Sequence, residues 1–240
     1  AEAHYIEGCS APKHETPALH AGGVEIYLAQ NAKLRYSSVE NWSLNTYNLN
    51  TKRAILSENA HIEWVGGNLG AGLTMLYPCS VLKGEHASAK HYSAAWAKSN
   101  QIQDMGAKVI HLAPYTRSEI ISKSVVQGNG QNIYRGLVKI LAPHCFNHSN
   151  CDTLLLDSDS YSNTIPDLIN HSAESSIGHE ASVGSINPED LAYLNSRGLN
   201  EEQSTSLLVS GFLQSISREL PLEYASEMNQ IIKMDLKNRS

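Results

Sequence analysis

Short alternating stretches dominate the first three quarters of the chain. Apolar and polar residues alternate at 24–28, 33–36, 61–64, 108–111 and 137–140, and Gly, Asn, Ser and Asp separate these segments. Alternation that includes β-branched and aromatic residues is typical of strands, and turn-forming residues mark their ends. No segment before residue 186 keeps a 3.6-residue period for three turns. This region is therefore predicted to be all-β.

A weak internal repeat runs through the same region. A small residue precedes an alternating strand at 31–36, 59–64 and 106–111, and the first two copies lie 28 residues apart. Irregular repeats of about 20–30 residues that each carry short strands favour a solenoid such as a parallel β-helix. Strands of similar length also occur in sandwiches and barrels. The pattern alone leaves both architectures open.

Helix signals begin after residue 186. Asn187 followed by Pro188 and two acidic residues is typical of a helix start, and Gly198 is placed to end that helix. A second helix is predicted from Asn200, with capping-box spacing, and a third from Pro221. The apolar stripe expected on the second helix consists of Leu207, Leu208, Gly211, Phe212, Ser215 and Ile216. We predict a β domain at 1–186 and a helical domain at 187–240.

Composition excludes several classes of function. The formal net charge is −6, and the 18 basic residues form no run, which argues against binding to nucleic acid or to a membrane surface. The longest apolar runs are far shorter than the roughly 18 residues of a membrane-spanning helix. The opening lacks the basic and apolar segments of a signal peptide, and four cysteines in 240 residues do not make a disulfide scaffold. We therefore expect a reducing compartment, the cytoplasm, with thiols free for chemistry.

The densest cluster of chemically active residues lies at 144–152. Two cysteines, Cys145 and Cys151, and two histidines, His144 and His148, occur there, and thiolate and imidazole both bind zinc or iron. The spacing matches no standard zinc finger. A site in which one of these cysteines joins ligands distant in sequence is a better candidate than a local four-ligand site. The alternative is that both are free cysteines that pack in the core without binding a metal.

Two further places attract attention. His179 and Glu180 are adjacent, and adjacent residues of a strand point to opposite faces unless the backbone bends, which Gly178 permits. Taken alone, His179 is better explained as a hydrogen-bonded structural histidine. Cys9 lies in a turn-like, accessible segment, where a thiol of lowered pKa acts as a nucleophile or sulfur carrier. A harmless loop cysteine is the alternative.

Several motifs, taken together, resemble the SufB family, the iron–sulfur cluster scaffold of the Suf assembly machinery. The resemblance covers nearly the whole chain and favours SufB over its paralogue SufD because the opening motif contains a cysteine. The motifs are EGCSAP at 7–12, VENW at 39–42, YNLNTKRA at 47–54, QDMGAK at 103–108, SKS at 122–124, YRG at 134–136, CDTL at 151–154, HEA at 179–181 and PLEYA at 221–225.

The resemblance implies a right-handed parallel β-helix followed by a small helical domain. It places sulfur acceptance at Cys9 and the nascent cluster at Cys151, with His179 and Glu180 beside it. Gly178 replaces the first glutamate of the family's Glu-His-Glu stretch, so a ligand role there is absent or filled by another residue. Cys145 and His148 remain weaker candidates on chemical grounds. The family also has sequence ahead of the position of Ala1, and we expect this chain to be the C-terminal half of a SufB-like protein or an unusually short relative.

The implied partners are a SufC-like ATPase docked on the C-terminal helices near Pro221, Glu223 and Tyr224, a SufD-like paralogue or a second SufB copy, and a cysteine desulfurase or sulfur shuttle. The implied cofactor is a transient [4Fe-4S] or [2Fe-2S] cluster, with flavin in the whole complex as a family-level suggestion. The chain would be a scaffold and not an enzyme, in the cytoplasm or in the plastid of a photosynthetic eukaryote. The alternatives are a cluster-free, SufD-like accessory subunit and a β-helix enzyme acting on polysaccharides.

Overall fold

The computed structural model describes residues 1–11 and 15–237 and contains fourteen strands followed by three helices. Pro12 of the EGCSAP motif and residues 238–240 of the predicted helical domain lie outside the described residues. The elements are β1 (Glu2–Ser10), β2 (Ala18–Leu28), β3 (Lys33–Asn41), β4 (Thr46–Leu56), β5 (His61–Asn68), β6 (Leu73–Leu76), β7 (Cys79–Leu82), β8 (Ser88–Ala97), β9 (Ile102–His111), β10 (Arg117–Val126), β11 (Gln131–Ile140), β12 (Phe146–Leu155), β13 (Tyr161–Asn170), β14 (Ser176–Ser185), α1 (Pro188–Ser196), α2 (Glu201–Ser217) and α3 (Leu222–Lys237).

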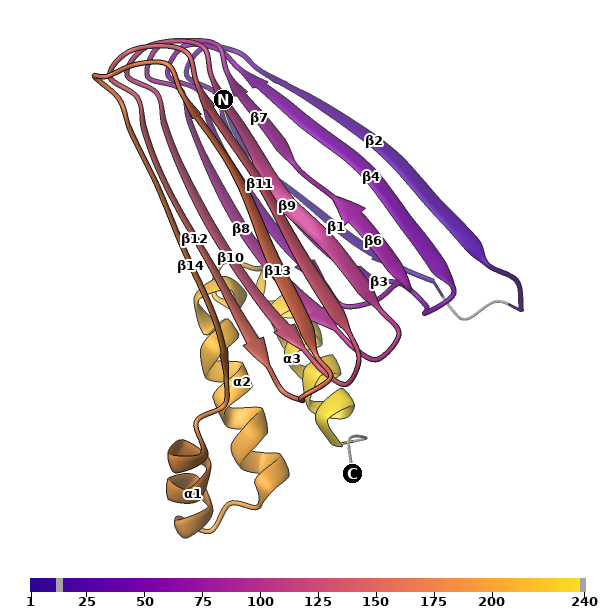
Figure 1. The fold of residues 1–240 in the computed structure, drawn as a ribbon. Helices are drawn as coiled ribbons and strands as arrows, with labels where there is room; N and C mark the ends of the chain where they lie inside the picture. Colours follow the sequence, from indigo (N-terminus) through magenta and orange to yellow (C-terminus); the bar gives the residue numbers. More distant parts are fainter. Residues whose placement is uncertain (12–14, 238–240) are drawn as a thin grey trace.

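The strands wind into a two-sheeted solenoid (Figure 1). The first sheet has the order β1-β3-β5-β8-β10-β12-β14, and the second has the order β13-β11-β9-β6-β4-β2, with β7 continuing the path of β6 between β4 and β9. All the strand pairs are parallel, so each coil of chain places one strand in each sheet. The prediction of a β-solenoid followed by helices is confirmed, and the sandwich and barrel are excluded.

The repeat seen in the sequence corresponds to one coil. Asn31 and Asn59 both have positive φ, at 62° and 54°, and occupy the same corner of successive coils. His86, Tyr115 and His144 follow at this corner with φ between 57° and 59°. Asparagine tolerates this left-handed conformation better than most residues. The third predicted copy, 106–111, was wrong as a member of the series, because it lies in β9 of the other sheet.

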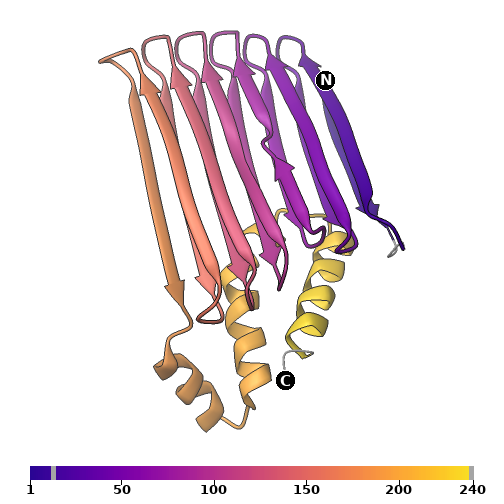
Figure 2. The same ribbon diagram turned by 45° about the vertical axis from the view of Figure 1, so that its right-hand side comes forward.

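The C-terminal helices cover part of the outer face of the first sheet (Figure 2). Trp96 is fully buried in this contact, and Val209, Leu213 and Ile216 of α2 pack into the same cluster. Leu207, expected in the buried stripe, is 53% exposed, because the sheet contacts a neighbouring stripe of the helix. Both predicted helix starts with an asparagine cap are present. The strands end at Ser185 and the first helix begins at Pro188.

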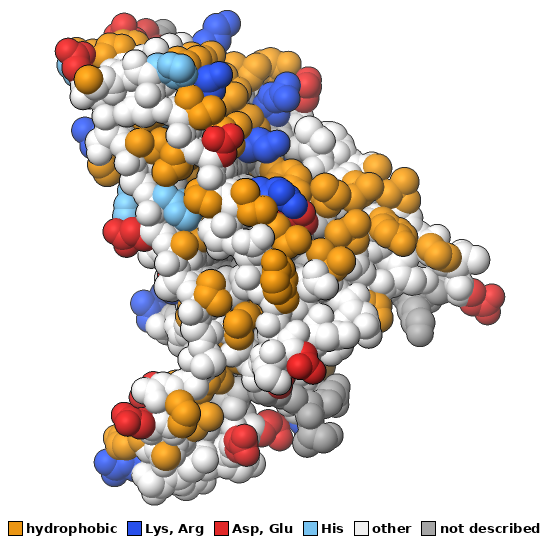
Figure 3. Space-filling model, viewed as in Figure 1, with side chains coloured by type: hydrophobic (Ala, Val, Ile, Leu, Met, Phe, Trp, Pro, Cys, Tyr) orange, Lys and Arg blue, Asp and Glu red, His pale blue; other side chains and the backbone are white. Residues whose placement is uncertain are grey.

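The outer face of the second sheet carries no helix among the described elements. Apolar side chains spread over this face (Figure 3), and Leu19, Tyr47 and Met75 are among those exposed there. Contiguous exposed apolar surface is a feature of protein-binding faces.

In the described part of the chain, no helix has the length and apolar character needed to cross a membrane.

Candidate functional site

Cys9 lies on the interior face of the first coil. In the parallel register of β1 and β3, Cys9 is opposite Glu40 and Glu7 is opposite Ser38. Residues two apart in a strand share a face, so Cys9 and Glu7 both face the second sheet across the interior. Cys9 is partly buried, in place of the open loop position that the sequence suggested.

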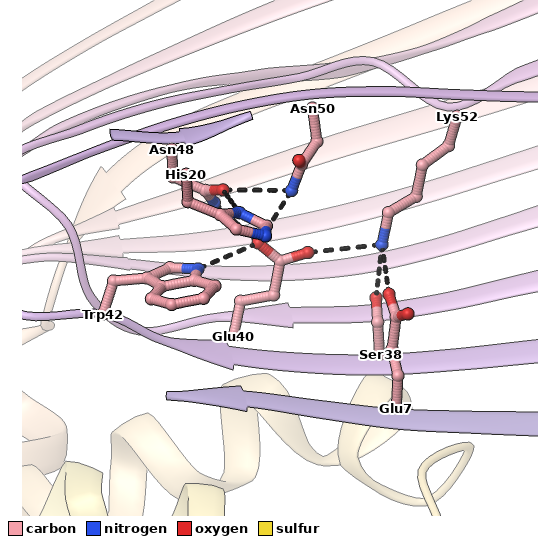
Figure 4. A network of polar contacts seen from close by, with 8 residues as sticks. All are labelled: Glu7, His20, Ser38, Glu40, Trp42, Asn48, Asn50 and Lys52. Atoms are coloured by element: carbon pink, nitrogen blue, oxygen red, sulfur yellow. Dashed lines mark hydrogen bonds and ion pairs between the residues drawn. The ribbon is translucent and has the colours of Figure 1, made fainter. Parts of the chain in front are cut away.

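A buried ammonium group holds this end of the interior together. Lys52 of β4 is 3% exposed, and its Nζ lies 2.7 Å from Oε1 of Glu7 and 3.2 Å from Oε1 of Glu40 (Figure 4). Lys52 also donates a hydrogen bond to Ser38 Oγ at 3.4 Å, and its Nζ lies 5.0 Å from the centre of the Tyr36 ring. A lysine is almost never fully buried unless it is paired. The two carboxylates account for its position.

Glu40 is the fixed member of this network. Its Oε2 accepts hydrogen bonds from Asn48 at 2.6 Å and from Trp42 at 3.3 Å, with a longer one from Asn50 at 3.5 Å. His20 extends the network, because its ring hydrogen-bonds Asn48 at 2.9 Å and stacks on the Trp42 ring at 4.2 Å. The sequence contained one signal for this network. Asn48, Asn50 and Lys52 recur at every second position of a strand, which puts three polar side chains on one face.

The surroundings keep the Cys9 sulfur protonated. Burial raises the pKa of the Cys9 thiol, the nearby Glu7 and Glu40 carboxylates raise it further, and the Lys52 ammonium lowers it. Burial and negative charge both disfavour a thiolate. The resting state at neutral pH is therefore a thiol.

A second cluster lies at the other end of the interior. Cys151 of β12 is 4% exposed and shares the interior face with Tyr134 of β11 and His179 of β14. Burial raises the pKa of the Cys151 thiol to about 12, although the Tyr134 hydroxyl acts in the opposite direction. Burial also lowers the pKa of His179, which favours the neutral imidazole. The buried Nε2 of His179 has no hydrogen-bond partner among the described residues.

Register places the histidine one coil beyond the cysteine. His179 is opposite Ser149, and Ala181 is opposite Cys151. His179 and Cys151 are therefore diagonal neighbours on one interior face. The coil of His179 is the last among the described strands, because β14 is an edge strand paired only with β12. A neutral imidazole with a free nitrogen and a nearby thiol are both ligands for iron.

The structure separates the other predicted residues from this cluster. Glu180 is opposite Asn150 on the outer face, since β14 runs without a bend at Gly178. His148 is also on the outer face, opposite Gly178. Cys145 is buried, but six residues of extended chain put it about 20 Å from Cys151. Within the described residues no group of three or more His, Cys, Asp or Glu side chains could hold a metal ion, so a local four-ligand zinc site at 144–152 is not formed.

One row of small and polar residues connects the two ends of the interior. Starting at Glu7, successive strands place Ser38, Gly66, Ser93, Ser122 and Cys151 opposite one another. Five strand spacings of about 4.8 Å make this path about 24 Å long. A cavity of about 30 Å³ lies near its middle, lined in part by Lys52, Gly66 and Ser93. This volume is roughly that of one water molecule.

The comparisons with known proteins decide the family. Residues 1–212 match the model of the SufBD core domain of the SUF system for iron–sulfur cluster assembly. The chain belongs to the SufBD family. It is 47% identical over 238 residues to an iron–sulfur cluster assembly SufBD family protein of Staphylococcus aureus strain MRSA252.

Relatives from other strains and species agree with this assignment. The protein of the same description from Staphylococcus aureus strain USA300 is also 47% identical, and that of Staphylococcus epidermidis is 46% identical. In each comparison 98% of this chain is covered and 51% of the relative. The chain thus spans about half the length of these curated SufBD relatives.

The SufBD residues predicted to meet a partner lie where α3 begins. Glu223 is exposed, and its neighbour Leu222 is 81% exposed. Tyr224 instead packs against β1 of the solenoid. Its ring is so close to Gly8 that a Cβ added there would lie 2.7 Å from it. Pro221 is half-buried and directly precedes the helix. Tyr224 thus lies beside the strand that carries Cys9 and remains partly exposed.

Proposed function

We propose that this chain is a SufB-like scaffold that accepts sulfur at Cys9 and supports a nascent iron–sulfur cluster at Cys151 and His179. The observation that carries the proposal is the second interior cluster, in which a buried thiol and an unpaired imidazole nitrogen share one face on neighbouring strands at the end of the solenoid. The presence of both cysteines favours a SufB-like role over that of a SufD-like accessory subunit.

The ligand set suits a site that must release what it builds. One thiolate and one imidazole leave iron with positions for sulfide and for ligands from elsewhere. The thiol must lose its proton when it binds iron, because the thiolate is the metal ligand. A pKa of about 12 makes this loss costly at neutral pH. Weak attachment to the scaffold follows, and transfer to an acceptor protein requires weak attachment.

Sulfur would reach this site through the interior as a small species. The path of about 24 Å is too long for a side-chain swing from Cys9 to Cys151, and the row of residues between them contains serine and glycine but no thiol. A persulfide at Cys9 would therefore release its outer sulfur as hydrosulfide into the serine-lined row when the thiolate of an external dithiol reductant attacks the Cys9 sulfur. The resulting mixed disulfide at Cys9 would be resolved by the second thiol of that reductant, which restores the Cys9 thiol and supplies the two electrons. Sulfur first reaches Cys9 by thiolate attack on a desulfurase or shuttle persulfide.

Two surfaces support the proposed partners. The last coil leaves the edge of β13 and β14 open and exposes Ile165, Leu168 and Val183, which suits pairing with a second solenoid, a SufD-like paralogue or another SufB copy. The C-terminal helices expose Tyr193 and Leu222 and suit a SufC-like ATPase. ATP hydrolysis would then belong to that partner, and this chain would act as a scaffold without catalysis of its own.

Anaerobic reconstitution with ferrous iron and sulfide tests the proposal. We expect the wild-type chain to gain visible charge-transfer absorption and Cys151→Ser to lose it, while Cys145→Ser, a matched buried cysteine about 20 Å away, retains it. Equal clusters in wild type and Cys151→Ser would contradict the proposal. Absence of a cluster in the wild type, also with SufC-like and SufD-like partners added, would favour the accessory role.

A further inference from the structure

The interior around Cys9 contains more negative than positive charge. Two carboxylates, Glu7 and Glu40, share one ammonium group, that of Lys52. Cys9 is directly opposite Glu40 and two residues from Glu7 on the same face. A thiolate or persulfide anion at Cys9 would be a third negative charge beside a single cation. Sulfur acceptance at this position therefore needs a change in the charges around it.

The two carboxylates differ in their freedom to change. Glu40 is 2% exposed in its side chain and is held by Lys52, Asn48 and Trp42. The side chain of Glu7 is 21% exposed, and Lys52 is its ion-pair partner. A partly exposed carboxylate with few partners can give up an ion pair to water, whereas one held by several donors stays in place. Glu7 is the adjustable member of the pair.

We propose that Glu7 is a positioning residue that holds Lys52 away from Cys9 and keeps this cysteine in its thiol form until sulfur is delivered. The inference rests on the proposed role of Cys9 in sulfur acceptance and adds the control of that role. Lys52 is the counter-ion that the sulfur anion takes over from Glu7.

The transfer step balances without an added oxidant or reductant. The proton on Cys9 Sγ is lost to solvent water, and the Lys52 ammonium turns from Glu7 to the new thiolate. The thiolate attacks the outer sulfur of a persulfide on the donor protein, so that a sulfur–sulfur bond forms at Cys9 while the one in the donor breaks. The donor leaves as a thiolate.

The other charged or titratable groups near Cys9 do not supply this control. Tyr36 of β3 faces the same interior, but burial raises its pKa, so it stays neutral. His20 of β2 is engaged with Asn48 and Trp42. The Glu40 carboxylate raises the pKa of Cys9 as Glu7 does, but hydrogen bonds from Asn48 and Trp42 hold it in place. Glu7 remains as the ion-pair partner that Lys52 can leave.

The test is the pH dependence of Cys9 alkylation by iodoacetamide in the full chain, followed by peptide mass spectrometry. Cys79, on the outer face of the second sheet, serves as the internal reference. Since one pKa unit changes the thiolate fraction about tenfold, we expect Glu7→Gln to raise the rate at pH 7.5 about tenfold by lowering the pKa of Cys9. Glu7→Asp, which keeps the charge, should behave like the wild type, as should the exposed Glu25→Gln.

The sign of the effect decides the outcome. If Glu7 instead directs Lys52 toward Cys9, Glu7→Gln will leave the alkylation rate unchanged or lower it, and the inference is overturned. An equal acceleration in Glu7→Asp would also overturn it, because loosened packing would then be the cause. Because alkylation needs neither a sulfur donor nor a cluster, its result can be interpreted even if the reconstitution experiment contradicts the scaffold proposal. Far-UV circular dichroism of each variant confirms that the comparison is between folded chains.

Discussion

Replacing Lys52 with methionine should destabilise the protein strongly. The side chains of Lys52 and Glu40 are 4% and 2% exposed, and their charged atoms lie 3.2 Å apart. Removal of one partner from a buried ion pair costs about 3–5 kcal/mol, because the other charge is left without compensation. Glu40 keeps hydrogen bonds from Asn48 and Trp42, so we expect the lower end, about 3 kcal/mol.

A double-mutant cycle separates the charge from the loss of packing. Glu40→Gln removes the negative charge with little change in shape, so Lys52→Met should cost only about 1–2 kcal/mol in that background. The free energy of unfolding is measured by urea denaturation at pH 7.5, with tryptophan fluorescence and circular dichroism as probes. Lys83→Met, at an exposed turn, is the control and should stay within about 0.5 kcal/mol of wild type. Equal costs of Lys52→Met in both backgrounds would refute the reasoning.

Three further outcomes are expected. Gly106→Ala should destabilise the fold by more than about 2 kcal/mol, because the new Cβ would overlap the backbone of the neighbouring strand. Gly23→Ala, which meets no neighbour, should be near neutral, and thermal denaturation compares the two variants. Burial lowers the pKa of His91 to about 3 and that of His111 to about 4, so both rings stay neutral in the folded chain while the unfolded chain takes up protons below about pH 6.5. The stabilising contribution of the neutral rings should therefore be fully present above that pH. As the pH drops toward the folded pKa, the free energy of unfolding should fall by about 1.4 kcal/mol per pH unit for each histidine. His91→Gln should reduce this slope between pH 5 and 6.5. Trp96→Ala should cost about 3–5 kcal/mol and expose the C-terminal helices to limited proteolysis, and unchanged cleavage there would contradict the packing described.

The strands and the repeat were predictable because their cause is local, whereas the choice of a solenoid over a sandwich or barrel needed the family resemblance. Alternation along each strand depends on neighbouring residues, and the 28-residue spacing of Asn31 and Asn59 is the length of one coil. The coil from β12 to β14 is 30 residues long, since Cys151 is opposite Ala181, and His179 lies 28 residues after Cys151. His179 therefore falls two positions short of the residue opposite Cys151, on the same face. Sequence motifs named both residues, but the coil length explains why they are neighbours.

The charged interior was much harder to predict. A lysine in an alternating strand is normally assigned to the solvent face, because a lysine is rarely buried. The partners of Lys52 lie 45 and 12 residues away, at Glu7 and Glu40. Their proximity depends on the register of three strands and on the two sheets facing each other. Local sequence patterns contain information neither on the register nor on which sheets face each other. Glu180 is the opposite case. It is adjacent to His179 in the sequence, but it faces away from the cluster.

The most direct test of the scaffold account is pulsed EPR of the reconstituted and reduced protein, which detects nitrogen bound to a cluster. The account predicts a histidine nitrogen coupling in the wild type that disappears in His179→Gln and persists in His148→Gln, whose ring lies on the outer face of the neighbouring strand. A coupling that survives in His179→Gln, or one that disappears with His148, would contradict the placement of the cluster at Cys151 and His179.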